Sequence, residues 1–281
     1  MKYYKEQTDK NGLVYSCDML RITFDMRKDA VPMYNAYLEN ATRADITSYP
    51  QDFKPYRYRY MYTIDYGMEY GKMALGLSFN GSASDKLRCY MEFNPNKCMG
   101  NPQCARDVEW LLRNCSVSEV ARWDLAIDIR VERTLCELKK DHRKYGFEMR
   151  GQEDKTEYLG ARNSAGRVKL YNKTIESKLD YDLTRLEVTA DSLHLSDVMA
   201  YIPEVVVYKA QRELLFSDLS KTEALLVKLL REKDTPCLYM RELDYRKRKK
   251  IEPYVIGSDT KLELDSTCIY AIISDLKQYC K

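Results

Sequence analysis

Strict alternation of apolar and polar residues between positions 122 and 130 constrains the fold of this chain more than any other feature. The odd positions of this segment are all apolar, whereas the even positions hold Arg122, Asp124, Ala126, Asp128 and Arg130. Successive side chains of a β-strand point to opposite faces of the sheet, so the pattern predicts a half-buried strand with one charged face. Related patterns predict further strands at 20–25, 58–64, 73–79, 86–93, 167–173 and 185–188.

Helical spacing of apolar residues replaces this alternation in two parts of the chain. One helix is expected between Ala105 and Arg113, and beyond residue 195 four helices are expected, at 204–216, 221–233, 239–250 and 266–279. A run of strands followed by a run of helices indicates an α+β protein, with a mainly antiparallel central sheet and flanking helices. We therefore expect an α+β catalytic and DNA-binding domain over residues 1–195 and a helical C-terminal region over residues 196–281.

Composition excludes several classes of protein. The 46 basic and 43 acidic side chains leave a net charge of +3. No uncharged apolar run approaches the ~18–20 residues of a membrane helix, and the N-terminal residues do not form a signal peptide. We therefore expect a cytoplasmic protein with no membrane partner. Nine scattered cysteines without a Cys-x-x-Cys pair, and only two histidines, argue against a zinc site and for free thiols in a reducing compartment.

Three of the predicted strands carry charged side chains on one face, with a tyrosine among them. If these strands are neighbours in one sheet, their polar side chains meet on a common face: Asp124, Asp128, Lys169, Tyr171, Lys173, Arg185 and Glu187. One interpretation is an antiparallel sheet that exposes a charged face to water. The other is a catalytic site, in which carboxylates bind Mg²⁺ or Mn²⁺, basic groups hold a phosphate, and a tyrosine beside a cation or base acts as the nucleophile.

Four ordered segments resemble the signature of the replication initiation factor (Rep_trans) family. They are Arg122–Asp128, Thr156–Ser164, Arg167–Glu176 and Thr184–Glu187. Ala161, Asn172 and Trp123 differ from the residues usual in that family, but none of these differences removes a reactive group. The segment Met91–Lys97 is also similar to filamentous-phage replication proteins. The resemblance covers about residues 120–190, so the N-terminal 80 residues and the C-terminal region are outside it.

The resemblance implies an activity and a set of partners. Members of the family initiate rolling-circle replication by nicking one strand of a hairpin origin with a tyrosine. The tyrosine stays on the 5′ phosphate, and the free 3′-OH primes a polymerase. The expected partners are therefore single-stranded or hairpin origin DNA, a host helicase and a polymerase. A homodimer is one alternative for the oligomeric state. Two alternatives are a relaxase of an integrative element with the same chemistry, and a non-catalytic origin-binding protein.

The resemblance also implies roles for individual residues. Four side chains would act on the DNA: Tyr171 as nucleophile, and Lys169, Lys173 and Arg185 as phosphate contacts. Four carboxylates would be metal ligands: Asp124 and Glu187 first, then Asp128 and Glu92. Because Asp124 and Asp128 are about 13 Å apart along an extended strand, one ion does not easily bind both directly. Tyr158 is the alternative nucleophile.

Basic residues outside this set are candidates for DNA binding. Arg57 and Arg59 alternate with tyrosines between positions 56 and 62, which is typical of a surface where bases stack, and equally of an amphipathic strand. Arg162 and Arg167 lie within the resembling segments. Arg246, Lys247 and Arg248 begin a basic run at 246–250, which is either a phosphate-binding surface or a solvated one.

Overall fold

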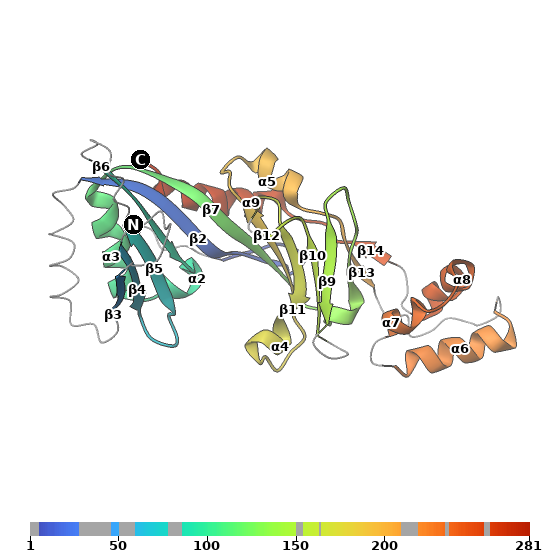
Figure 1. Ribbon diagram of the computed structural model, residues 1–281. Coiled ribbons are helices and arrows are strands. Elements are labelled where there is room, and N and C mark those ends of the chain that lie inside the picture. Colours follow the sequence, from blue (N-terminus) through green and yellow to red (C-terminus); the bar gives the residue numbers. More distant parts are fainter. Residues whose placement is uncertain are drawn as a thin grey trace.

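A computed structural model describes residues 6–27, 46–50, 60–77, 86–149, 154–162, 164–208, 219–233, 236–255 and 259–281 (Figure 1). Its main element is an antiparallel sheet whose strands follow the order β3-β4-β5-β6-β2-β7-β12-β11-β10-β9, with β1 paired to β2. The strands are β1 Gln7–Thr8, β2 Val14–Arg27, β3 Ile46–Pro50, β4 Tyr60–Asp65, β5 Lys72–Leu77, β6 Lys86–Phe93, β7 Cys115–Ile129, β9 Tyr145–Met149, β10 Lys155–Leu159, β11 Val168–Asn172 and β12 Thr184–Ala190.

A smaller antiparallel sheet and the helices complete the fold. The small sheet has the order β14-β13-β8, from β8 Cys136–Leu138, β13 Val205–Tyr208 and β14 Asp259–Lys261. The helices are α2 Pro95–Cys98, α3 Pro102–Arg113, α4 Lys173–Ser177, α5 Leu195–Tyr201, α6 Lys221–Arg231, α7 Pro236–Met240, α8 Tyr245–Val255 and α9 Ser266–Leu276, with 3₁₀ turns η1 Arg133–Leu135 and η3 Lys277–Tyr279. The predicted α+β fold with a mainly antiparallel central sheet is confirmed.

The apolar face of the long sheet lies in the main core. The odd-numbered side chains of β7, among them Trp123, Leu125 and Ile127, are fully buried there together with Ile269 and Ile272 of α9. Helix α3 packs against β7, α5 against β12 and α9 against β2. The opposite face of these strands is therefore left for the polar side chains. Among the described residues, no helix is long and apolar enough to cross a membrane.

A second, smaller cluster joins α6, α7 and α8. Its buried side chains are Val206, Val227, Leu230, Met240, Ile251 and Val255. These three helices lie together at one end of the molecule, on the right of Figure 1. Helix α9 belongs to the main core instead, so the two parts of the predicted helical region pack in different places. The boundary at residue 195 stays a prediction.

Two of the predicted helices differ from the structure. The helix predicted at 204–216 is wrong over Val205–Tyr208, which form β13 between β8 and β14. Three consecutive valines favour an extended chain, because β-branched side chains lose χ1 freedom in a helix. Residues 209–216 of that prediction lie outside the described residues. The helix predicted at 239–250 is interrupted: Asp244 accepts a hydrogen bond from the backbone N–H of Lys247 at 2.9 Å, and this cap begins α8.

Candidate active site

The strand register brings the predicted site residues onto one face of the sheet. Between β11 and β12, Lys169 is opposite Glu187 and Tyr171 is opposite Arg185. Between β12 and β7, Arg185 is opposite Asp128, and Thr189 is opposite Asp124. Residues directly opposite one another in antiparallel strands point to the same face. We call the face that carries these side chains the polar face: Lys169, Tyr171, Arg185, Glu187, Asp124 and Asp128.

Tyr171 lies between cations and is covered by its neighbours. The ammonium nitrogen of Lys169 is 3.7 Å from the centre of its ring, and that of Lys173, at the start of α4, is 5.8 Å away. Only 4% of Tyr171 is exposed. Burial, and then the charge of Glu187, raise the pKa of the Tyr171 hydroxyl well above its ordinary value, although Arg185 opposes the shift. Burial therefore favours the neutral phenol in this arrangement, and Arg185 is the charge that favours its anion.

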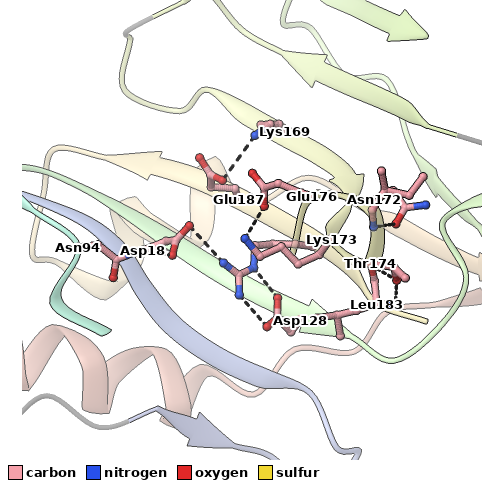
Figure 2. A network of polar contacts seen from close by, with 12 residues as sticks. Asp18, Asn94, Asp128, Lys169, Asn172, Lys173, Thr174, Glu176, Leu183 and Glu187 are labelled. Carbon is pink, nitrogen blue, oxygen red and sulfur yellow. Dashed lines mark hydrogen bonds and ion pairs between the residues drawn. The ribbon is translucent and has the colours of Figure 1, made fainter. Parts of the chain in front are cut away.

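Arg185 is held by two carboxylates from different strands. Its Nε and Nη2 atoms donate to the two oxygens of Asp128 at 2.5 and 2.8 Å. Its Nη1 atom is 3.1 Å from Oδ2 of Asp18 in β2. Figure 2 shows these contacts, with Asp18 and Asp128 on either side of the guanidinium. Asp128 is therefore paired with Arg185 rather than directed at the other predicted metal ligands.

Asp124 is a buried carboxylate and Glu187 a half-buried one, and the charge of each is incompletely compensated. Asp124 is 6% exposed, and within the described part of the chain its Oδ1 atom has no hydrogen-bond partner. The nearest cation to that atom is Nη2 of Arg122, at 3.7 Å. Burial raises the pKa of Asp124. A hydrogen bond with Thr189 and the charge of Arg122 oppose the shift, whereas the nearby charges of Asp18 and Glu92 add to it. Burial and Asp124 likewise raise the pKa of Glu187, against the opposing effect of Lys169, whose Nζ is 4.0 Å from its Oε2.

This donor set fits a hard divalent cation in part. Carboxylate oxygens are the ligands that Mg²⁺ and Mn²⁺ prefer, and Oδ1 of Asp124 is a buried oxygen that nothing described satisfies. In the described residues, however, no three acidic, histidine or cysteine side chains lie close enough to form a metal-binding group. Glu92 is also engaged elsewhere, because its Oε2 atom is 2.5 Å from Nε of Arg21. Mg²⁺ is commonly bound by one or two carboxylates together with water and substrate phosphate, and Asp124 with Glu187 matches that pattern.

The remaining predicted residues lie around this face or away from it. Tyr158 on β10 is opposite Lys169; its hydroxyl donates to Glu148 at 3.2 Å, and the guanidinium of Arg167 lies 5.0 Å above its ring. Tyr158 thus contacts β9 rather than the acids of β7. Arg162 is exposed in the turn between β10 and β11. Arg57 and Arg59 lie outside the described residues.

The predicted basic run forms part of α8. Arg246 and Lys247 are exposed there, Arg248 is half-buried, and in the part of the chain that the structure describes no acid pairs with them. The other two cations of the run are neutralised: Lys249 pairs with Glu252 at 3.7 Å and Lys250 with Glu223 at 2.8 Å. The unpaired cations therefore lie in the first turn of α8, on the second cluster and not on the polar face.

Asp18 is the site residue that the sequence reasoning missed. The buried apolar residues of β2 are odd-numbered up to Tyr15 and Cys17 and even-numbered from Leu20 and Ile22 onward. A change of phase of this kind indicates an irregularity in the strand, and Asp18 lies at it. This change in the spacing of apolar residues can be read from the sequence, and it is the pattern that identifies Asp18.

Comparison with known proteins gives similarity among solved structures. No protein-family model matches the chain, and no curated protein matches it. Among solved structures, the chain is similar to a rolling circle replication initiator protein from Geobacillus stearothermophilus, with 15% sequence identity and a TM-score of 0.40. The match covers 95% of this chain and 97% of that chain. A similarity of this size carries no argument about function, so the function is argued from the polar face.

Proposed function

We propose that this protein initiates rolling-circle replication by nicking one DNA strand and later rejoining it through Tyr171. The observation that carries the proposal is the register of β11, β12 and β7, which puts one tyrosine beside Lys169, opposite Arg185 and near two under-compensated carboxylates. Such a set combines a nucleophile, cations for a phosphate and oxygen ligands for a metal ion. The ordered sequence segments that resemble replication initiators support the same conclusion.

The proposed reaction is a transesterification at phosphorus. The hydroxyl oxygen of Tyr171 attacks the scissile phosphate, a Tyr–O–P bond forms, and the bond from phosphorus to the 3′ oxygen breaks. The proton of the phenol is lost, and the 3′ oxygen gains one to become a 3′-OH. Attack by a 3′-OH on the phosphotyrosine reverses these changes and rejoins a strand. The phosphodiester bond is exchanged rather than hydrolysed, because one phosphodiester replaces another.

The chain's own side chains have distinct parts in this reaction. Lys169, Lys173 and Arg185 stabilise negative charge on the phosphate oxygens, and Arg185 also favours the phenolate. Asp124 and Glu187 would hold Mg²⁺ or Mn²⁺, which when bound polarises the phosphodiester. A host polymerase extends the 3′-OH, and a helicase separates the strands. A relaxase would use the same chemistry at a transfer origin.

The proposal is tested with single-stranded oligonucleotides tiled across the DNA that flanks the gene, incubated with protein and Mn²⁺. We expect a protein–DNA adduct that survives denaturing electrophoresis and is lost in Tyr171→Phe, while DNA binding is retained. Tyr158→Phe is the matched control, because it removes a hydroxyl from the next strand of the same sheet, and we expect it to keep the adduct. Chelation of divalent ions should abolish the adduct.

Three results would count against the proposal. Adduct formation by Tyr171→Phe would assign the nucleophile to another residue. An adduct that persists under chelation would remove the metal from the reaction. DNA binding without any adduct from the wild-type chain, on every oligonucleotide and on supercoiled DNA, would favour the non-catalytic origin-binding protein.

A further inference from the structure

Asp18 lies at an irregularity of β2, on the strand that borders β7. Cys17 and Met19 pair with successive residues of β7, so Asp18 between them is the extra residue of a β-bulge. A bulge changes the direction of a side chain, and bulges are over-represented next to active sites. Here the redirected side chain is a carboxylate that reaches across β7 to Arg185 on β12.

Both oxygens of Asp18 are used by other elements. Oδ1 accepts a hydrogen bond from Nδ2 of Asn94 at 2.8 Å, and Oδ2 is 3.1 Å from Nη1 of Arg185 (Figure 2). Asn94 is itself fixed, because its Oδ1 atom caps α2 by accepting from the backbone N–H of Lys97 at 3.2 Å. The position of the Asp18 carboxylate is therefore set by the start of a helix as well as by its own strand.

The guanidinium of Arg185 is consequently held along two edges. Asp128 accepts hydrogen bonds from its Nε and Nη2 atoms, and Asp18 forms an ion pair with its Nη1 atom. Arg185 is 8% exposed and lies directly opposite Tyr171 in the register. The charge of Asp18 also acts on the rest of the polar face, since it contributes to the raised pKa of Asp124 and of Glu187. Asp18 is thus close to each part of the proposed site.

We propose that Asp18 is a positioning residue: together with Asp128, it fixes Arg185 beside Tyr171 before DNA binds. This inference rests on the proposed function. Asp128 alone would fix one edge of the guanidinium, whereas a second carboxylate on the other edge removes its remaining freedom. A side chain ordered in advance does not lose rotamer entropy when the substrate binds, and a misplacement of about 1 Å in such a site lowers a rate about 10²-fold.

The test compares Asp18→Asn, Arg185→Lys and the double variant by the rate of Tyr171 adduct formation with saturating oligonucleotide. Asp18→Asn keeps the size of the side chain and can still accept from Asn94, but it loses the charge that holds Arg185. We expect it to slow the adduct ~10–100-fold and to change DNA affinity less than about threefold. Because Asp18 acts through Arg185, the double variant should be no slower than Arg185→Lys alone within about twofold. Asp25→Asn, on the same strand, is the control with an unchanged rate.

The outcomes separate the possible failures. Additive losses in the double variant, or an Asp18→Asn defect that a higher Mn²⁺ concentration corrects, would make Asp18 a metal ligand and overturn the positioning role. If the wild type forms the adduct and Asp18→Asn forms it at the same rate, the positioning role is overturned but the proposed function is not. Absence of any Tyr171 adduct in the wild type would overturn the proposed function, and this inference with it.

A second variant applies if Asp18→Asn does not fold. In Asn94→Ser the serine hydroxyl still caps α2, but it is too short to replace the amide that donates to Asp18. We expect a ~3–10-fold slower adduct without loss of DNA affinity, because the carboxylate is less firmly placed. An unchanged rate in this variant would overturn the positioning role.

Discussion

At the scale of single residues, the environment of Tyr171 favours the neutral phenol over its anion. Burial and Glu187 raise its pKa, whereas Lys169 lies against its ring. In the proposed reaction, a metal ion bound by Asp124 and Glu187 would neutralise the charges that oppose the phenolate. The tyrosine would then become reactive only when the metal ion is in place. In the proposed reaction, this coupling would restrict strand cleavage to the assembled complex.

A buried ion-pair cluster behind the polar face gives a prediction on pH. Oε2 of Glu157 is 2.6 Å from Nη2 of Arg133, and its Oε1 is 2.7 Å from Nζ of Lys155 and 2.6 Å from the hydroxyl of Tyr145. Burial alone would raise the pKa of Glu157, but Arg133 and Lys155 outweigh it and lower the pKa. The cluster links η1 to β10, and Arg133 also donates to the carbonyl of Leu170 in β11 at 3.3 Å.

We predict that Glu157→Gln lowers the free energy of unfolding at pH 7 by about 3–5 kcal/mol, because it leaves Arg133 buried without its partner. A folded-state pKa below the unfolded one gives stability that is present above the unfolded pKa, near ~4.3, and lost as the pH falls through the folded pKa. The difference in free energy of unfolding between wild type and Glu157→Gln should therefore be smaller at pH 3 than at pH 7. Denaturant unfolding at both pH values measures it, with exposed Glu148→Gln as control. An equal difference in free energy of unfolding at the two pH values would contradict the lowered pKa of Glu157.

At the scale of elements, the turn between β10 and β11 leads into the strand that carries Lys169 and Tyr171. Gly160 begins this turn with a positive φ of 84°, and a Cβ there would lie 3.3 Å from Cα of Arg167. A side chain in this left-handed conformation costs about 1–2 kcal/mol. The requirement explains why a glycine stands between the two strands.

We predict that Gly160→Ala lowers the free energy of unfolding by about 1–2 kcal/mol and slows adduct formation, since Tyr171 and Lys169 lie on the displaced strand. Gly146→Ala is the matched control on β9: an added Cβ meets nothing within 4 Å, and no positive φ is present. It should change the free energy of unfolding by less than about 0.5 kcal/mol. Equal stability of the two variants, measured by denaturant unfolding, would show that the turn does not need a glycine.

Local patterns predicted the strands of this fold better than its irregularities. The alternation around Asp124 gave the charged and apolar faces of β7, because a sheet repeats every two residues. The strand at Val205–Tyr208 was missed because its partners, β8 and β14, are distant in sequence. Helical spacing continued past Asp244, where only a side-chain cap marks the break.

The candidate site shows the same division. The polar residues of β11, β12 and β7 could be placed on a common face from the sequence. Their ion pairs could not be predicted from the sequence. The pairing of Arg185 with Asp128 and Asp18 depends on the order of four strands in the sheet and on the bulge in β2. The carboxylates of β7 and β12 were predictable, whereas Asp18 at the bulge of β2 was missed.

At the scale of the whole molecule, charge is distributed unevenly between two packed units. The net charge of the chain is only +3, so binding to DNA requires local concentrations of cations. On the polar face, most of the predicted cations are paired or near acids, as Arg185 is with Asp128. The first turn of α8 carries Arg246, Lys247 and Arg248, which have no acidic partner among the described residues. We therefore expect non-specific DNA affinity to depend on α8.

We predict that the triple variant Arg246→Ser, Lys247→Ser, Arg248→Ser binds origin and unrelated DNA more weakly by similar factors. Each phosphate contact contributes about 0.9 to the slope of log K against log salt concentration, so losing up to three contacts should reduce that slope by ~2–3. Adduct formation at saturating DNA should stay unchanged, because α8 is in a different cluster from the polar face. The control is Lys249→Ser with Lys250→Ser, whose ammonium groups already pair with Glu252 and Glu223. A salt slope equal to that of the wild type would make the first turn of α8 a solvated surface, whereas a lost adduct at saturation would place these cations in the reaction itself.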